Sequence, residues 1–447
     1  MNKAVLKKLI QIIIFVIIAT AVYFIPISGL NEAGRRTLSI LIFAALLWIT
    51  EIIPVYVTSF VILFLQAILL TRPMDVNFRV FLAPFFDSVI VLFLGGLILA
   101  QALKKYELDE WFVFLILKKI GNTPRKILLG FMAVTAFLSM WMSNTATTAL
   151  MIGLVLVLAE NIPKDDPLLY ALTLGIPFSA NIGGIATPIG TPPNALTISI
   201  LKNKGINISF IGWMAFALPL TILLFLLIYW ILSSSFKSNL KVVPVVKPKE
   251  FIFDIQQKVI LWVFLITLAL WLTSELHKIP TSIVSLIPVI VFHSIGLLNE
   301  EDFGAFGWDT LMLMGGGLSL GMSIEKSGLS SWFVNAVRLQ SFPNILLLIG
   351  LAIITILLTT FISNTSAAAI LLPIAVGISP KFIDTALLVG ISASIAMILP
   401  ISTPPNAIAY GAGIIKLRDM VKFGSIIAIG SAIIIVIFIK ILTLIIS

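Results

Sequence analysis

The chain has 447 residues, of which 60% are hydrophobic and 11% charged, and its net charge is +9. A soluble domain carries about 25% charged residues, so this composition excludes a soluble globular protein. Apolar runs of about 20 residues, the length at which a helix crosses a bilayer, recur from end to end. They are unbroken rather than alternating, so we expect an all-α polytopic membrane protein. The basic residues lie in short loops beside these runs, which indicates membrane topology and not nucleic-acid binding.

In chain order, the first predicted span covers 9–27. It is expected to be retained, because the apolar stretch is too long for a secretory signal and no small-residue cleavage site follows. The apolar pattern then predicts spans over 37–53, 55–71, 84–104, 168–200 and 208–235. After a polar linker it predicts spans over 258–275, 281–297, 309–326, 383–415 and 419–446. The expected total is eleven transmembrane helices.

Two further apolar segments, 124–160 and 342–378, carry a polar Ser-Asn-Thr in their middle, starting at Ser143 and at Ser363. Each segment is long enough for two helices of about 15 residues. Such a helix spans about 22 Å and falls short of the ~30 Å hydrocarbon core. We therefore predict two re-entrant hairpins, each with Ser-Asn-Thr at its tip.

The two halves of the chain repeat four landmarks in the same order. "WITEIIP" at Trp48 matches "WLTSELHKIP" at Trp271, and "LGGLILAQALKKYELDEWFV" matches "GGGLSLGMSIEKSGLSSWFV". "SNTATTA" matches "SNTSAAA", and "GTPPNAL" matches "STPPNAI". Such self-similarity indicates a duplication. Each copy holds five spans and one hairpin, so the second copy enters the membrane from the opposite side, which is an inverted-topology repeat.

Consecutive prolines lie inside two predicted spans, Pro192 and Pro193 in the first copy and Pro404 and Pro405 in the second. Proline removes a backbone donor and clashes with the preceding turn, so both helices should break in mid-membrane. Unwound backbone at that depth is tolerated only where it is buried in protein or lines a wet cavity. The alternative is a proline kink that serves packing alone.

Two hairpin tips and two broken helices bring several helix ends toward the bilayer midplane. Helix N-termini offer free N–H groups and a partial positive charge, which suit an anion. Side-chain donors come from Asn144, Thr145, Thr191, Asn364, Thr365 and Thr403, and free carbonyls with hydroxyls such as those of Ser139 and Ser143 suit a small cation. The pattern predicts an anion flanked by cations. No nucleophile–base pair, metal cluster or phosphate loop is present, so we do not expect an enzyme.

These paired motifs resemble the divalent anion:sodium symporter family of dicarboxylate carriers, over most of the chain. The resemblance implies an elevator-type homodimer with no cofactor other than Na+ as a possible coupling ion. It implies a scaffold domain over 1–123 and 258–341, a transport domain over 124–235 and 342–447, and a cytoplasmic linker over 236–257. The expected location is the plasma membrane as a multi-pass protein with a cytoplasmic N-terminus, which agrees with the placement of the basic residues.

The resemblance also implies roles for individual residues. The substrate carboxylates would meet Asn144, Thr145, Thr191, Pro192, Asn364, Thr365, Thr403 and Pro404. A first sodium site would involve Ser139, Ser143, Asn144 and Gly190, and a second would involve Thr359, Ile362, Asn364 and Ser402.

The chain departs from sodium-coupled relatives at one point. Those relatives often have Thr-Glu before the second Ser-Asn-Thr, whereas this chain has Thr359 and Thr360. Sodium symport and sodium-independent dicarboxylate exchange both remain open. The expected substrates are C4 and C5 dicarboxylates such as succinate, malate, fumarate or 2-oxoglutarate, and the alternatives are a citrate or sulfate carrier or an anion channel.

Overall fold

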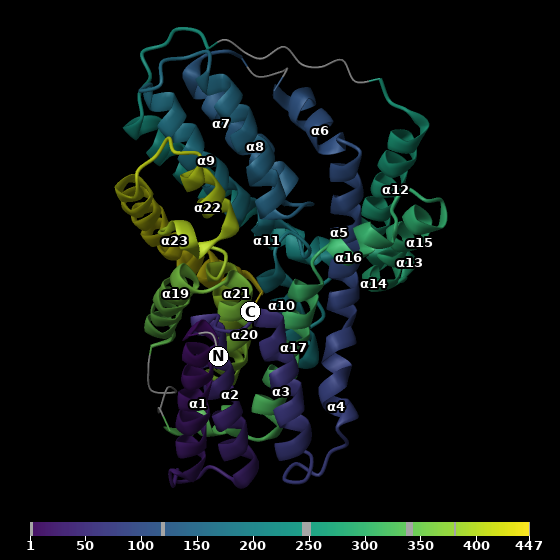
Figure 1. Ribbon diagram of the computed structural model, residues 1–447, viewed down its shortest axis with the longest axis vertical. Helices are drawn as coiled ribbons and strands as arrows, with labels where there is room; N and C mark the ends of the chain where they lie inside the picture. Colours follow the sequence, from purple (N-terminus) through teal and green to yellow (C-terminus); the bar gives the residue numbers. More distant parts are fainter. Residues whose placement is uncertain (1–2, 118–120, 244–251, 337–342, 380, 447) are drawn as a thin grey trace.

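The computed structural model describes residues 3–117, 121–243, 252–336, 343–379 and 381–446, and the described part is built of helices (Figure 1). The first half contains α1 (Lys3–Phe24), α2 (Glu32–Thr50), α3 (Val55–Leu69), α4 (Arg79–Leu82), α5 (Ser88–Lys105), α6 (Leu108–Leu117), α7 (Pro124–Ser139), α8 (Asn144–Ala159), α9 (Pro167–Gly183), α10 (Pro192–Asn203) and α11 (Phe210–Ser235). The second half contains α12 (Ile255–Leu272), α13 (Ser274–His277), α14 (Thr281–Val284), α15 (Leu286–Ser294), α16 (Glu300–Ala305), α17 (Trp308–Lys326), α18 (Leu329–Ala336), α19 (Asn344–Phe361), α20 (Asn364–Ile378), α21 (Phe382–Ser392), α22 (Pro404–Gly411) and α23 (Leu417–Ile446).

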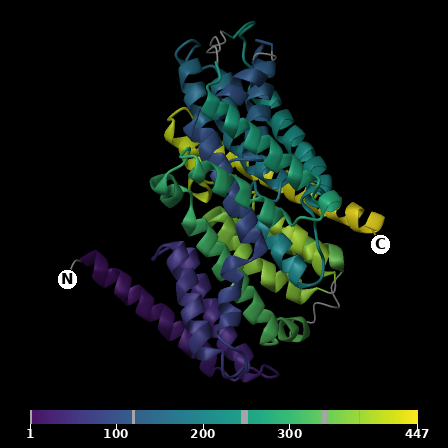
Figure 2. The ribbon, with the colours of Figure 1, turned by 90° about the vertical axis from the view of Figure 1, so that its right-hand side faces the viewer.

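Eight helical segments in the described ranges are long and apolar enough to cross a membrane. They are Val5–Phe24, Glu32–Thr50, Arg79–Lys105, Pro167–Ala186, Phe210–Ser235, Ile255–Leu272, Asn344–Phe361 and Leu417–Leu442. The polytopic all-helical fold predicted from composition is therefore confirmed, whereas the count of eleven spans stays a prediction. The apolar side chains of α1 are exposed along an arm on the outside of the molecule, as lipid contact requires (Figure 2).

The segment predicted as a span over 281–297 is an apolar helix over Thr281–Ser294 with one turn residue inside it, so this span stays a prediction. The helix divides at Ser285 into α14 and α15. Pro288 has no N–H to donate to the carbonyl of Val284 four residues earlier, so the regular helical ladder cannot pass through this point.

The internal repeat is visible in matched hydrogen bonds. The indole of Trp48 donates to the carbonyl of Val55 at 3.2 Å, and the indole of Trp271 donates to the carbonyl of Thr281 at 3.1 Å. Both indoles are fully buried, and each bond closes the turn after the "W…P" motif. The later helices also pair in order, α5 with α17 through α11 with α23. In Figure 1, α7 and α8 lie in the upper half and α19 and α20 lower down.

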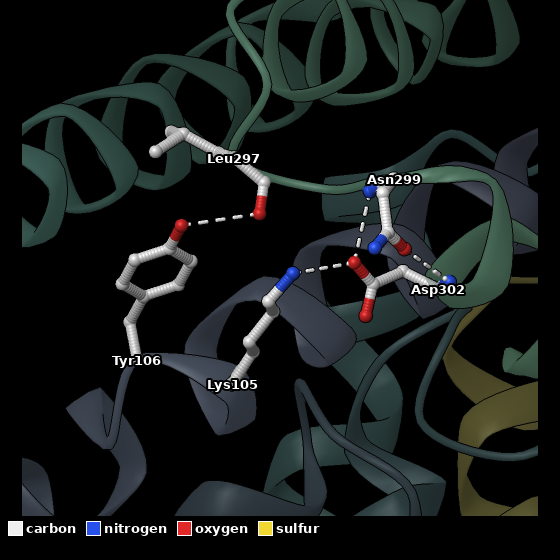
Figure 3. Close-up of polar contacts among 5 residues, drawn as sticks. All are labelled: Lys105, Tyr106, Leu297, Asn299 and Asp302. Atoms are coloured by element: carbon white, nitrogen blue, oxygen red, sulfur yellow. Dashed lines mark hydrogen bonds and ion pairs between the residues drawn. The ribbon is translucent and has the colours of Figure 1, made fainter.

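Polar contacts join the end of α5 to α16 and to the segment that precedes it (Figure 3). Lys105 Nζ lies 2.5 Å from Asp302 Oδ2, and the Tyr106 hydroxyl donates to the carbonyl of Leu297 at 3.1 Å. Although burial raises the pKa of Asp302, the hydrogen bonds from Lys105 and from the Asn299 backbone hold it below its usual value. A second cluster lies between α3 and α17, where Gln66 bonds Ser319 and Ser323 at 2.8 Å each. The two contacts join the first half of the chain to the second.

The first hairpin packs on the first broken helix through a glycine. A Cβ at Gly183 would lie 2.3 Å from the carbonyl oxygen of Ala136 on α7, so α7 and α9 would have to separate. We expect Gly183→Ala to lower the thermal midpoint of the purified protein by several degrees, because the clash is with backbone. Gly153→Ala on α8 is the matched control, since nothing lies within 4 Å of its Cβ position and alanine favours a helix. An unchanged midpoint in Gly183→Ala would contradict this packing.

Candidate functional site

Each hairpin tip is built by a serine that caps the returning helix. Helix α7 ends at Ser139, and α8 begins at Asn144 with Ser143 as its N-cap; the Ser143 hydroxyl accepts from the N–H of Ala146 at 3.1 Å. In the second copy, the Ser363 hydroxyl accepts from the N–H of Ser366 at 3.1 Å. A capped helix start still presents further free N–H groups. The polar triplet therefore ends one membrane helix and opens the next.

The side-chain oxygen of the asparagine at each tip accepts a hydrogen bond from a buried hydroxyl of the preceding helix. Ser139 Oγ lies 2.5 Å from Asn144 Oδ1 and 2.8 Å from the carbonyl of Ala180. Thr359 Oγ1 lies 2.8 Å from Asn364 Oδ1 and 2.7 Å from the carbonyl of Ala393. Each hydroxyl engages the oxygen of its asparagine, so the Nδ2 group remains as the donor for a ligand. The two tips have the same construction.

The breaks in the two long segments fall where the prolines predict them. Helix α9 ends at Gly183, and after a short 3₁₀ turn the chain is extended at Thr187 and Thr191 before α10 begins at Pro192. In the second copy, α21 ends at Ser392 and α22 begins at Pro404. Thr187 donates to the carbonyl of Met140 at 2.6 Å, so the first break is tied to the first tip. In the second copy, Ser402 donates to the carbonyl of Thr360 at 2.8 Å.

Two buried asparagines donate to the backbone carbonyls of the two helix breaks. Neither asparagine is among the predicted site residues. Asn194 Nδ2 lies 2.9, 3.1 and 2.7 Å from the carbonyls of Gly184, Ile185 and Thr187. Asn406 Nδ2 lies 2.9 Å from the carbonyl of Ala396 and 3.0 Å from that of Leu399. Both side chains are fully buried. The signal was present in the sequence, because each asparagine follows a Pro-Pro pair in both copies.

A third asparagine links the copies. Asn181 on α9 is fully buried, and its Nδ2 lies 3.4 Å from the carbonyl of Ala396 and 3.5 Å from Asn406 Oδ1. Both neighbours are acceptors, which fixes the orientation of the Asn181 amide. The first broken helix thereby contacts the break of the second.

The two tips and the two breaks line one cavity of about 830 Å³. The predicted residues in its wall are Ser143, Asn144, Thr145, Gly190, Thr191, Pro192, Ile362, Asn364, Thr365, Ser402, Thr403 and Pro404. Ser139 and Thr359 do not reach the cavity; they are fully buried and support the asparagines. Thr360 donates to the carbonyl of Ile356 in its own helix at 2.7 Å.

Further parts of the wall come from α2 and the turn after it, α3, α5 and α17, and they include two acids. These acids are Glu51, directly after α2, and Asp309, in the first turn of α17. Among the described residues in this wall, none is lysine or arginine. An anion in this cavity would therefore have helix N-termini and amide and hydroxyl donors to bind it, rather than a basic side chain of the described wall.

Two solved structures share the overall fold. The YdaH transporter of Alcanivorax borkumensis superposes with a TM-score of 0.58 over 81% of this chain and 87% of that one, at 14% identity. The MtrF protein of Neisseria gonorrhoeae gives a TM-score of 0.56 over 98% and 94%, at 12% identity. Identities this low establish the fold alone. With eight helical segments long and apolar enough to cross a membrane among the described residues, that fold defines the class as a multi-pass membrane protein.

The particular family follows from sequence. Residues 6–446 match the family model described as "Sodium:sulfate symporter transmembrane region". The sodium-dependent dicarboxylate transporter SdcS of Staphylococcus saprophyticus is 33% identical, over 91% of this chain and 85% of that protein. An uncharacterized transporter of Haemophilus influenzae is 34% identical, over 93% and 92%. The chain belongs to the divalent anion:sodium symporter family, as its motifs predicted, and this is a family of transporters and not of enzymes.

Proposed function

We propose that this protein is a secondary-active transporter of C4 and C5 dicarboxylates such as succinate, malate, fumarate or 2-oxoglutarate. The observation that carries the proposal is the matched pair of tips in one cavity, where Asn144 and Thr145 face the same space as Asn364 and Thr365. A dicarboxylate has two anionic ends, so a repeat with two equivalent sets of donors suits it. The names of the Staphylococcus relatives support the same substrate class.

Sodium is the proposed coupling ion. The first cation site would use Ser143, Asn144 and Gly190, and the second would use Ile362, Asn364 and Ser402; Ser139 and Thr359 would orient the two asparagines. Oxygen ligands of this kind suit a hard cation. The second site lacks a carboxylate at position 360, so exchange of one dicarboxylate for another remains the competing mode beside symport.

The transport cycle is proposed to be an elevator in a homodimer of eleven-span protomers. Residues 124–235 and 342–447 would move as the transport domain, residues 1–123 and 258–341 would form the scaffold, and 236–257 would be the cytoplasmic linker. The lining of the cavity supports this division. The side chains of the tips and breaks belong to the proposed transport domain, and the acids Glu51 and Asp309 belong to the proposed scaffold. The plasma membrane and a cytoplasmic N-terminus are part of the proposal.

Uptake into proteoliposomes tests the function. We expect saturable uptake of labelled succinate, driven into empty vesicles by an inward sodium gradient if the mode is symport. A strict need for dicarboxylate inside the vesicles, without an effect of sodium, identifies exchange. Uptake of sulfate or citrate that succinate does not compete with would overturn the substrate assignment. Flux that follows a clamped membrane potential without saturating would indicate a channel.

A further inference from the structure

Two polar contacts join the far end of the first broken helix to scaffold helices. Lys204 Nζ, just after α10, lies 2.6 Å from Glu325 Oε1 on α17. Lys202 Nζ donates to the Ser88 hydroxyl at the start of α5 at 2.7 Å. Both contacts lie between the proposed moving and fixed parts, so they must break if the transport domain slides.

The internal repeat identifies the residues that would take these places in the opposite state. Counting from the matched Thr-Pro-Pro-Asn, Lys204 corresponds to Lys416 and Lys202 to Ile414. In the matched stretches "ALKKYELDEWFV" and "SIEKSGLSSWFV", Glu325 corresponds to Lys104. The backbone three residues after Lys104 and after Glu325 supports this register, because Glu107 and Gly328 both have positive φ, 57° and 77°.

In a transporter built from an inverted repeat, the second end state is the first with the roles of the two copies exchanged. The exchange would replace the pair Lys204–Glu325 by Lys416 and Lys104, which are both cationic. The contact of Lys202 with Ser88 would have no equivalent, since an isoleucine cannot donate. In the part of the chain that the structure describes, neither Lys104 nor Lys416 forms an ion pair, and both are exposed.

We propose that the Lys204–Glu325 pair biases the resting protein toward the described state, and that the like charges of Lys104 and Lys416 disfavour the opposite state. The inference rests on the proposed transport function. Asp109 lies within electrostatic reach of Lys104, but it is 6% exposed, and it accepts the N–H of Glu110 at 3.0 Å. Because one end state has an attractive pair and the other a repulsive pair, the two end states of the transport cycle differ in free energy.

The expected size of the bias is modest. The side chains of Lys204 and Glu325 are 30% and 46% exposed, and pairs of such exposure contribute about 0.2–1 kcal/mol. Removing the pair should therefore change the ratio of the two states by about two- to fivefold at most. Added salt should reduce the difference between variants, because it screens exposed charges.

The chain has no cysteine, so one introduced thiol is a unique reporter of state. Ala100 lines the cavity from α5 and is partly exposed, outside the proposed binding residues. In proteoliposomes of Ala100→Cys, we expect Glu325→Gln to slow labelling by a membrane-impermeant maleimide about two- to fivefold. Lys104→Glu supplies the missing pair in the opposite state and should also slow labelling. Adding Lys416→Gln to Lys104→Glu should cancel that effect.

Lys326→Gln, a charge removal next to Glu325, is the matched control and should leave the rate unchanged. The charge exchange Lys204→Glu with Glu325→Lys should restore the original rate. Unchanged labelling in both Glu325→Gln and Lys104→Glu, in vesicles that still take up succinate, would overturn the inference and leave the proposed function standing. Absence of saturable uptake in the parent protein would overturn both.

Discussion

Uptake by Asn144→Ala is expected to fall at least tenfold, to the limit of detection, while the protein remains folded. The side chain lies at the first tip, and its Nδ2 is the free donor left after Ser139 engages Oδ1. A hydrogen bond to a charged partner is worth about 1.5–3 kcal/mol, and the same asparagine belongs to the proposed cation site. Initial rates of succinate uptake into proteoliposomes measure the effect.

Asn364→Ala should reproduce this loss, because Thr359 holds Asn364 in the same way. Asn161→Ala is the matched control: it makes the same substitution beyond the far end of α8, where the side chain only donates to the carbonyl of Val157. Normal uptake by both tip variants would refute the site. If a tip variant elutes from a size-exclusion column in detergent with a smaller peak than the parent protein, part of it has not folded. The binding of labelled succinate by the folded fraction then decides whether the asparagine contacts the substrate.

The second large effect is expected at the helix breaks. Asn194→Ala removes the side-chain amide that lies within hydrogen-bond distance of three buried carbonyls. After the substitution the carbonyl of Ile185 still accepts from the Trp213 indole, and that of Thr187 from the N–H of Gly190, so the Gly184 carbonyl is the most affected. A buried polar group left without a partner costs about 1–3 kcal/mol. We expect the thermal midpoint to fall by more than in any tip variant and the yield of monodisperse protein to drop severalfold.

Asn406→Ala should act in the same direction but less strongly, because its amide serves two carbonyls. Asn203→Ala, at the exposed end of α10, supplies the control for the loss of an amide in the same helix. Fluorescence-detected size-exclusion chromatography after stepwise heating measures all three variants. Midpoints equal to that of the parent protein in Asn194→Ala and Asn406→Ala would show that the breaks do not depend on these side chains.

The hairpins and the breaks could be predicted from sequence because their causes are local. Ser143 caps the helix that follows it, and Pro192 and Pro404 cannot continue the helices that precede them. The repeat added the partner of each motif, and the family resemblance placed the matched supports Ser139 and Thr359 among the predicted residues. Their place was not: both lie one layer beneath the cavity wall, because only packing decides which hydroxyl reaches the surface.

Other features depend on long-range packing that a single sequence does not contain. The amide of Asn194 is visible in the motif, but the carbonyls it faces depend on how the broken backbone folds back. Glu51 and Asp309 lie at the ends of helices, and nothing in their neighbours indicates that both border the same cavity. The division at Ser285 was missed because one proline in an apolar run looks like an ordinary kink.

The acids in the cavity wall affect how tightly the scaffold binds the substrate during transport. A dianion gains its binding free energy from the tips and breaks, while Glu51 and Asp309 on the opposite wall repel it. Cations that accompany the anion reduce this repulsion. In the proposed cycle, the two acids would thus weaken any hold of the scaffold wall on the anion. The substrate would stay with the moving domain when that domain leaves the scaffold, because the repulsive wall is stationary and the donors of the tips move with the substrate.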